Sequence, residues 1–289
     1  MACKLPQIER HLSAPADDCR NPIQNIMNDR REFLRNSFAA ASIATLATGA
    51  SGQDQEPAVK PSEVDGYCYR LPKLKQGCRL LFQGDSITDM QWGRNEKDRN
   101  HYLGHSYVFL IAARLGVDMP DAQLDIYNRG MSGHKVGDLR GRWKKDAIDM
   151  KPDLLCILIG VNDVGKNLNG VDVKSWEADY RFLLHASREA NPELKLVLLD
   201  PFVLPSGRLS NRDSYKRWRD QIERLIPIVV RLSEEFDAVH VKTQEVFDTA
   251  AKAGSPGNWI WDGVHPLPQG HELIARSWLH EVSRNWGSS

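Results

Sequence analysis

The sequence predicts an α/β fold in which helices cover both faces of a parallel, doubly wound sheet. From about residue 66 onward, short apolar runs alternate with segments of helical periodicity. Several of the short runs are apolar at successive positions, which is typical of strands buried on both faces. We see no internal repeat and no second change of composition after residue 66, so we expect one folded domain over residues 66–289.

Five short runs are expected to be the strands of this sheet. They cover residues 79–83, 124–127, 154–159, 194–199 and 238–241. The segments "SYVFLIAARLG", "SWEADYRFLLHASREA" and "RWRDQIERLIPIVVRLSEEF" lie between them and carry apolar residues three and four positions apart. This spacing predicts helices that pack on the sheet. Pro227, inside the last segment, is expected to begin or kink a turn of a helix at 215–236.

The composition argues against a polyanionic partner. The chain has 38 acidic and 38 basic residues and no long basic run, so no net field attracts nucleic acid or an anionic membrane. Five cysteines, at positions 3, 19, 68, 78 and 156, lack the spacing of a zinc or redox motif. Cys68 and Cys78 could pair after export, whereas Cys156 lies in an apolar run and is expected in the core.

The first 65 residues differ from the rest of the chain. In "NDRREFLRNSFAAASIATLATGASG", two arginines precede Phe33 and Leu34, and a weakly apolar, Ala-rich stretch follows. This resembles a twin-arginine export signal, although an amphipathic helix or an uncleaved anchor would also fit. We expect residues 1–50 to be an N-terminal extension with such a signal, and residues 51–65 to be a linker.

The signal leads us to expect a periplasmic or extracellular protein. Residues 1–26 would form a long preface to a twin-arginine signal. A start at Met27 would place the arginine pair almost at the N-terminus, so both Met1 and Met27 are candidate starts.

Four polar clusters lie where a parallel sheet places its ligands, outside the carboxyl ends of the strands. They read "GDSITD", "NRGMSG", "GVND" and "WDGVHP". The first three follow expected strands, and the fourth lies in a late loop. We therefore expect the four clusters to meet at one edge of the sheet.

Ser86, in the first cluster, is a candidate nucleophile. A serine hydroxyl needs a base that takes its proton and a third group that orients the base. His265 and Asp262, three residues apart in the fourth cluster, are candidates for these groups. Each motif taken alone also has a simpler explanation, since Ser86 could cap a helix and "DGVH" could be a turn with a surface histidine.

The oxyanion of an acyl-transfer reaction needs fixed hydrogen-bond donors. The candidates are the side-chain amide of Asn162 and the N–H of Gly130, which has no Cβ to block an approach. The alternatives are a helix cap for Asn162 and a turn of positive φ for Gly130 and Gly133.

The segments "FQGDSITD", "YNRGMSG", "IGVND" and "DGVHP" resemble, in order, the four sequence blocks of the SGNH (GDSL-type) hydrolase family. Its members are esterases, lipases, thioesterases and carbohydrate deacetylases. The resemblance covers about residues 78–282. It implies a flavodoxin-like, three-layer α/β/α sandwich with a five-stranded parallel sheet, and no metal or organic cofactor.

The same resemblance assigns roles to the residues already singled out. It implies Ser86 as the nucleophile, Asp262 as the orienting acid and His265 as the base. It also implies that Ser86, Gly130 and Asn162 form the oxyanion hole.

A narrower resemblance is to the bacterial acetylxylan esterases of this family. The stretches "NRGMSGHKVGDLRGRW", "KPDLLCILIGVNDV" and "WDGVHPLPQGHELIARSWL" look like theirs, including the pair Arg142 and Trp143. The chain departs from them mainly at residues 90–107 and 164–173. We therefore expect an exported serine esterase that removes acetyl groups from a polysaccharide or its oligomers, with no nucleic-acid partner and no integral membrane association.

Other functions remain open at this point. One is a lysophospholipase or acyl-thioesterase on the same fold, and another is a carbohydrate-binding protein without catalysis. A nucleotide-binding domain is disfavoured because "GDSITD" has one glycine where a dinucleotide loop has three. The oligomeric state is open, although close relatives often form homo-oligomers.

Several neighbouring residues have weaker expectations. Trp261 and Trp92 are possible sugar-stacking platforms, as is Trp259, with ordinary packing as the alternative for each. Asp85 and Asp163 are expected to accept backbone N–H bonds that hold their loops. His134 is expected in a solvent-facing loop, and His271 at the start of the last helix.

Overall fold

The computed structural model describes residues 71–286, apart from 96 and 99. The expected N-terminal extension 1–50, the linker 51–65, the candidate start Met27 and Cys68 lie outside these residues. The expectations about export and about a Cys68–Cys78 pair therefore stay predictions. Within the described part, Cys78 and Cys156 are buried free cysteines.

Five parallel strands form one sheet in the order β2-β1-β3-β4-β5. Their bounds are β1 Arg79–Gly84, β2 Asp125–Gly130, β3 Leu154–Leu158, β4 Lys195–Leu199 and β5 Val239–Val241. All five expected strands are confirmed, with the largest difference at the end of β2. This strand runs three residues beyond Tyr127 because Gly130 still pairs with Gly84 of β1.

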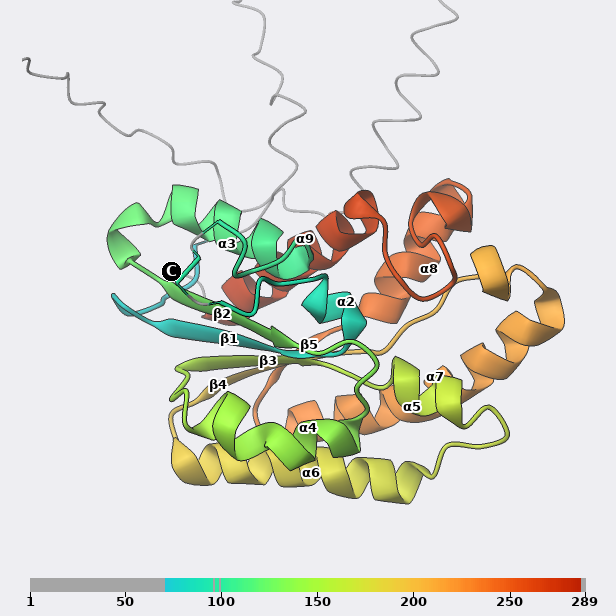
Figure 1. Ribbon diagram of the computed structural model, residues 1–289, viewed down its shortest axis with the longest axis horizontal. Helices are drawn as coiled ribbons and strands as arrows, with labels where there is room; N and C mark the ends of the chain where they lie inside the picture. The colour runs from blue at the N-terminus through green and yellow to red at the C-terminus, as the bar shows by residue number, and fades with distance from the viewer. Residues whose placement is uncertain (1–70, 96, 99, 287–289) are drawn as a thin grey trace, which may run out of the picture. The chain divides into compact units, whose positions relative to one another are not determined.

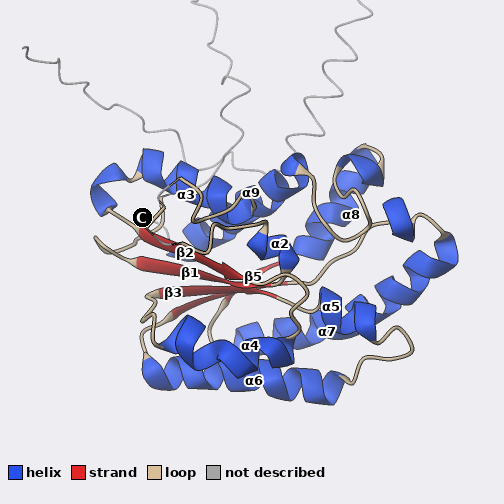
Figure 2. Cartoon of the chain, in the orientation of Figure 1, coloured by secondary structure: helices blue, strands red, loops and turns tan. Residues whose placement is uncertain are grey.

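Helices cover both faces of the sheet (Figures 1 and 2). One layer contains α3 Tyr107–Asp118, α8 Thr243–Ala253 and α9 Pro268–Trp286, and the other contains α4 Val136–Trp143, α6 Val173–Ala190 and α7 Arg212–Glu235. The short helices α2 Ser86–Asp89 and α5 Val161–Lys166 follow β1 and β3. Single helical turns complete the connections at η2 Pro120–Ala122, η3 Lys144–Ile148, η4 Gly207–Leu209 and η5 Pro256–Asn258. The predicted three-layer α/β/α fold is confirmed.

The three helices expected from periodicity are confirmed as α3, α6 and α7. Helix α7 continues through Pro227 to Glu235, so the proline does not begin the helix. A proline inside a helix removes one backbone donor. The buried side chains of Leu225, Ile228 and Val229 on either side of it pack against the core and offset that loss.

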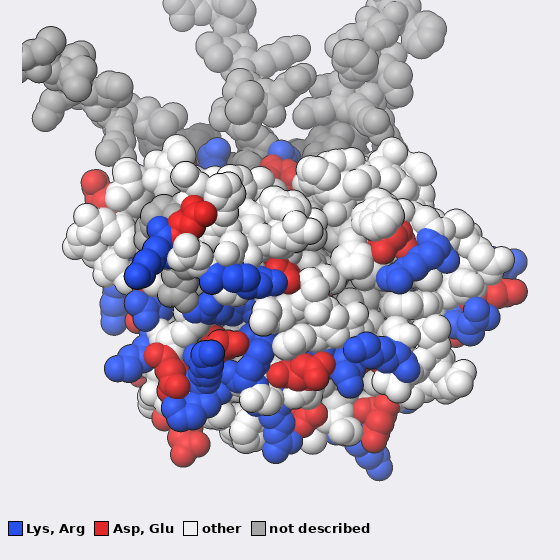
Figure 3. Space-filling view, viewed as in Figure 1, with Lys and Arg blue, Asp and Glu red and all other residues white. Residues whose placement is uncertain are grey.

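The core lies on both faces of the sheet. All five residues of β3 are buried, and Phe82 of β1 contacts the rings of Tyr107 in α3 and Trp278 in α9. These contacts fix α3 and α9 against the strand that leads into Ser86. Basic and acidic side chains are interspersed on the face shown in Figure 3, in keeping with the balanced composition. Within residues 71–286, no helix is both long enough and apolar enough to cross a bilayer.

Phe82→Ala is expected to destabilise the fold by about 3–5 kcal/mol, because a fully buried ring leaves a cavity that its neighbours fill only partly. The measurement is the free energy of unfolding in urea. Phe109→Ala provides the control, since the Phe109 side chain in α3 is 45% exposed and its loss should cost under about 1 kcal/mol. Equal losses in the two variants would contradict this account of the core.

Candidate active site

Ser86 is the first residue of α2, directly beyond the carboxyl end of β1. Asp85 precedes it, and its Oδ1 accepts a hydrogen bond of 3.0 Å from the Ile87 N–H. Asp85 therefore caps the helix, and the alternative that Ser86 is the cap is wrong. The Ser86 N–H lies in the first turn, where backbone donors have no partner within the helix.

A continuous chain of hydrogen bonds joins the serine to the late loop. Ser86 Oγ lies 2.7 Å from His265 Nε2, and His265 Nδ1 lies 2.8 Å from Asp262 Oδ2. Because Asp262 accepts from Nδ1–H, Nε2 of the neutral ring is free to accept the serine proton. The three side chains expected to act together are therefore in hydrogen-bond contact.

The carboxylate of Asp262 is held by its own loop. Its Oδ1 accepts the N–H groups of Val264 and His265, at 2.9 and 2.8 Å. Burial alone would raise the pKa of Asp262, but the hydrogen bonds from His265 and from these backbone N–H groups hold it well below its ordinary value. Asp262 thus stays charged beside the imidazole over a wide pH range.

The segment that follows β4 makes hydrogen bonds to the loop that carries Asp262 and His265. The Leu204 N–H donates to the Gly263 carbonyl at 3.1 Å, and the Ser206 hydroxyl donates to the Ile260 carbonyl. Gly263 has a φ of 94°, and a Cβ there would lie 2.5 Å from Leu209 Cγ. A residue with a side chain would therefore displace the loop from its support.

Arg208, from the same segment, was not singled out from the sequence. Its guanidinium lies 3.6 Å from Asp262 Oδ2 and its side chain is 55% exposed. No motif marks this position, because its contact with Asp262 arises only from the fold.

The candidate oxyanion donors do not all meet the expectation. Asn162 lies in α5, and its Nδ2 donates to the His134 carbonyl at 3.1 Å, which leaves its second amide hydrogen without a partner among the described residues. Gly130 differs. Its N–H donates to Asn128 Oδ1 at 2.9 Å, and a Cβ on it would lie 2.3 Å from the backbone N of Asp89.

The glycine at position 130 is therefore explained by close packing of β2 against α2, and its N–H is not available to an oxyanion in this structure. Gly133 is exposed, has a φ of 81°, and makes no N–H hydrogen bond to a described residue. From the sequence, Gly133 was expected only as a turn residue and not as an oxyanion donor. Gly133 directly precedes His134, whose carbonyl accepts a hydrogen bond from the Asn162 amide. The sequence does not reveal this contact, so position alone could not mark Gly133 as a candidate oxyanion donor.

Asp85 and Asp163 accept backbone N–H bonds, as expected. Asp163 accepts from the Val136 N–H at 3.3 Å, which ties α5 to α4. Burial raises the pKa of Asp85 and the pKa of Asp163 to about 7. The second oxygen of Asp85, Oδ2, is buried and has no partner among the described residues.

The three tryptophans considered as sugar platforms lie in different surroundings. Trp92 is only 6% exposed, its indole N–H donates to the Gly130 carbonyl at 2.9 Å, and the guanidinium of Arg94 lies over its ring. The expectation of an open platform at Trp92 is therefore corrected to a packing role. Trp259 is partly buried, whereas Trp261 is 61% exposed.

The two further histidines differ in outcome: His134 is less exposed than expected, whereas His271 lies at the start of the last helix, as expected. His134 is half-buried and its Nδ1 accepts from Arg142 Nε at 3.2 Å. His271 is the fourth residue of α9 and is 1% exposed, and its Nδ1 accepts from the Tyr107 N–H. Burial, which disfavours the charged form, lowers the pKa of His271 to about 3, so it is a neutral core residue.

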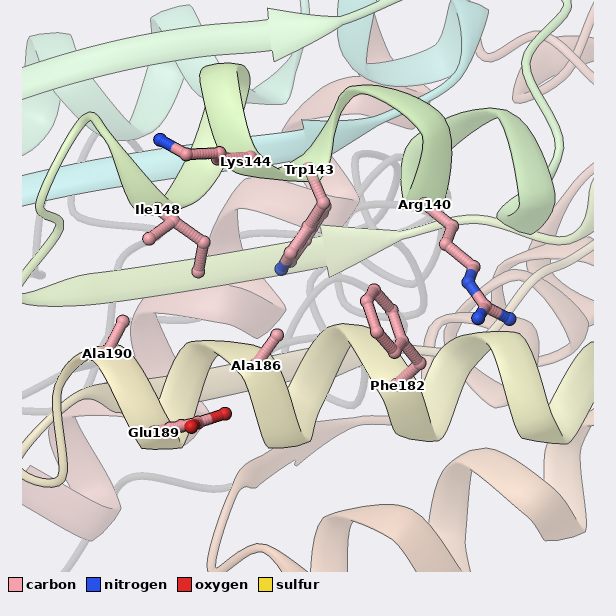
Figure 4. Close-up of a pocket in the computed structure, with 8 residues that line it drawn as sticks. All are labelled: Arg140, Trp143, Lys144, Ile148, Phe182, Ala186, Glu189 and Ala190. Carbon is pink, nitrogen blue, oxygen red and sulfur yellow. The ribbon is translucent and has the colours of Figure 1, made fainter.

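No group of three or more potential metal-ligating side chains occurs in the described part of the chain. The pocket in Figure 4 is lined by residues of α4, η3 and α6, among them Trp143 and Phe182, and by none of Ser86, Asp262 and His265. That pocket is therefore separate from the hydrogen-bonded site at the ends of the strands.

Comparisons with known proteins identify the family of the chain. Residues 82–273 match the model of the GDSL-like Lipase/Acylhydrolase family. An acetylxylan esterase from Geobacillus stearothermophilus is 34% identical over 223 residues, which are 74% of this chain and 98% of that protein.

Solved structures show the same likeness. A crystal structure described as a GDSL-like lipase from Parabacteroides merdae has 39% identity and a TM-score of 0.66, over 71% of this chain and 95% of that one. A catalytic mutant of the Geobacillus stearothermophilus acetylxylan esterase has 31% identity and a TM-score of 0.66, over 75% of this chain and 99% of that one.

Asp163→Asn is expected to gain stability relative to the parent as pH rises from 5 to 8. The folded-state pKa of Asp163 is raised by burial to about 7 from an ordinary value of 3.8. Between these values the unfolded chain loses the proton first, so the parent's unfolding free energy falls with pH, by up to about 1.4 kcal/mol per unit. Asparagine has no such proton to lose.

The measurement is the difference in urea-unfolding free energy between variant and parent at several pH values. Asp121→Asn, at an exposed position in η2, supplies the baseline. A difference for Asp163→Asn that stays flat or shrinks with pH would show that its carboxyl is not held protonated by the fold.

Proposed function

We propose that this chain, which belongs to the GDSL-like lipase/acylhydrolase family and is a carboxylic ester hydrolase, removes acetyl groups from a polysaccharide or its oligomers. The observation that carries the proposal is the hydrogen-bonded chain from Ser86 through His265 to Asp262. The named activity of the Geobacillus stearothermophilus relative supports acetylated carbohydrate as the substrate.

In the proposed reaction Ser86 Oγ attacks the ester carbonyl while His265 Nε2 takes its proton. His265 then gives that proton to the departing sugar oxygen, which leaves an acetyl group on Ser86. A water molecule, deprotonated by the same nitrogen, attacks the acetyl-enzyme and releases acetate with the proton returned to Ser86. Asp262 stabilises the imidazolium that forms in each half of the cycle.

The negative oxygen of each tetrahedral intermediate needs donors on the side away from His265. We propose the Ser86 N–H and the free amide hydrogen of Asn162 as two of them. Gly133 replaces Gly130 as the third candidate, because the Gly130 N–H is already donated to Asn128.

Trp261 is the proposed contact for the sugar. Its backbone N–H donates to the His265 carbonyl at 3.2 Å and its side chain is 61% exposed, so an indole face is available directly beside the acid and the base. Aromatic faces suit the C–H surface of a sugar ring.

We also propose export through the twin-arginine-type signal within residues 1–50, which rests on sequence alone. The test is the N-terminal sequence of the protein recovered from the periplasm or medium. Recovery only from the cytoplasm, with residues 1–50 intact, would contradict it. Homo-oligomer formation stays an expectation.

The main prediction concerns acetate release from a panel of acetylated glycans. The parent should release acetate from at least one glycan, and Ser86→Ala should lower kcat by at least about 1,000-fold, because the proposed acetyl intermediate forms on the Ser86 hydroxyl. An active Ser86→Ala variant would remove Ser86 from the mechanism.

The same assay separates the rival functions. The parent should cleave 4-nitrophenyl acetate faster than 4-nitrophenyl octanoate. A preference for octanoate would favour a lysophospholipase or acyl-thioesterase, and no cleavage of either ester would favour a carbohydrate-binding protein without catalysis.

Trp261→Ala should raise KM for the best acetylated oligosaccharide by about 10-fold, since a lost stacking contact is worth roughly 1–1.5 kcal/mol. Its kcat/KM for 4-nitrophenyl acetate should change by less than about threefold. Trp259→Ala is the matched comparison, because Trp259 lies two residues before Trp261 and is partly buried. Equal effects of Trp261→Ala on both substrates would assign the residue to loop packing and not to the sugar.

A further inference from the structure

We propose that Arg142 is a positioning residue that fixes the direction of the Asn162 amide relative to Ser86. The inference rests on the proposed roles of Ser86 as nucleophile and Asn162 as oxyanion donor. Arg142 touches neither residue directly, and it acts through the segment that connects β2 to α4.

Arg142 lies in the last turn of α4 with its side chain only 13% exposed. Nε donates to His134 Nδ1 at 3.2 Å, Nη1 donates to Asp146 Oδ2 at 3.2 Å, and Nη2 makes a longer contact of 3.5 Å with the Gly84 carbonyl. Gly84 is the last residue of β1, two positions before Ser86. One guanidinium therefore connects the strand that carries the nucleophile with the loop that carries His134.

His134 passes this restraint to Asn162. Its ring is held by Arg142, and its backbone carbonyl accepts one hydrogen of the Asn162 amide at 3.1 Å. A carboxamide is planar, so fixing the direction of one N–H fixes the direction of the other. The remaining N–H is the one that the proposed reaction uses.

The chemistry of the Arg142–His134 contact suits a permanent restraint. Nδ1 can accept from Nε–H only in a ring that carries no proton on that nitrogen. Burial, and secondly the charge of Arg142, lower the pKa of His134, so its ring stays neutral at neutral pH. In the neutral ring with its proton on Nε2, Nδ1 is the acceptor for the Arg142 Nε–H.

If Arg142 only stabilised the fold, its contacts with His134 and with the Gly84 carbonyl would not be needed. The pair with Asp146 is an i,i+4 contact between the end of α4 and η3, and it does not require His134. A planar guanidinium with five donors can hold three acceptors in different directions, which a lysine cannot do. Arg142 makes three such contacts at the edge of the proposed site, with His134, Asp146 and the Gly84 carbonyl.

Arg140 offers a matched control on the same helix. Its Nη1 donates to Asp179 Oδ1 at 2.7 Å, and its guanidinium stacks 4.3 Å from the centre of the Phe182 ring in α6. Figure 4 shows Arg140 beside Phe182, over α6. Arg140→Met therefore removes the same chemical group from α4 without a contact to His134 or Gly84.

The first test compares Arg142→Met and Arg140→Met on 4-nitrophenyl acetate. Arg142→Met should lower kcat by about 10- to 100-fold with KM within twofold, because a displaced donor affects the transition state more than substrate binding. Arg140→Met should keep kcat within twofold. A kcat for Arg142→Met within twofold of the parent would overturn the inference.

His134→Ala guards against a folding defect in Arg142→Met. It removes the ring that Arg142 holds but keeps the backbone carbonyl that holds Asn162, at a half-buried position. It should lower kcat by about as much as Arg142→Met, and the double variant should lose no more than about threefold beyond either. A parent-like kcat for His134→Ala would overturn the inference.

The deciding measurement is a double-mutant cycle with Asn162→Ala. If Arg142 acts through Asn162, adding Arg142→Met to Asn162→Ala should cost less than about threefold in kcat. Independent losses that multiply would overturn the inference, as would an Asn162→Ala variant with the parent kcat.

These outcomes separate the inference from the function on which it rests. A parent-like Asn162→Ala variant overturns the proposed role of Asn162 as well. A large loss in Asn162→Ala with a parent-like Arg142→Met overturns the inference alone. Because 4-nitrophenyl acetate reports ester cleavage itself, failure of the glycan panel would contradict the deacetylase proposal and leave the positioning role standing.

Discussion

The close approach of α2 to the ends of β1 and β2 is the constraint on which the site depends. A Cβ on Gly84 would lie 2.3 Å from Thr88 Oγ1 and 2.5 Å from the Leu158 carbonyl, and a Cβ on Gly130 would lie 2.3 Å from the Asp89 backbone N. Two strand ends without side chains thus allow a four-residue helix to sit directly on the sheet. The register that pairs Gly84 with Gly130 places both gaps side by side. Ser86 begins this helix, so the packing that holds α2 also sets the direction of its hydroxyl.

The other half of the site is organised independently. His265 is 179 residues from Ser86, yet Asp262 already fixes its ring through Nδ1 and through its own backbone N–H. The segment after β4 then supports the loop from behind at Gly263. Each half is held by hydrogen bonds of its own, so little reorganisation is needed when charge develops. The contact of 2.7 Å between Ser86 Oγ and His265 Nε2 then joins these two parts of the site.

The sequence predicted most of what depends on local pattern. The strands were placed within a few residues because they are buried on both faces. Ser86, Asp262 and His265 became candidates because four polar clusters follow one another in the expected order, although each motif alone had a simpler explanation. The end of β2 was placed too early because Asn128, Arg129 and Gly130 are not all apolar, yet still pair with β1. Gly130 and Trp92 were misjudged for another reason: their surroundings come from α2 and from the guanidinium over the indole, which no local pattern reveals. The contacts of Arg142 depend on three separate segments in the same way.

Asp85, Asp163 and Asp262 belong to the clusters that form the candidate site, and their environments shift their pKa values in opposite directions. Hydrogen bonds outweigh burial at Asp262 and keep it ionised, whereas burial raises the pKa of Asp85 and the pKa of Asp163 to about 7. Asp85 and Asp163 are the sequence neighbours of Ser86 and Asn162, so in the proposed reaction a full negative charge on either would repel the oxyanion. Partial protonation of both groups near pH 7 reduces that repulsion, while Asp262 stays charged beside the imidazole. Burying Asp85 and Asp163 costs folding stability, but it weakens their charge while Asp262 stays ionised at the position where the proposed reaction can use it.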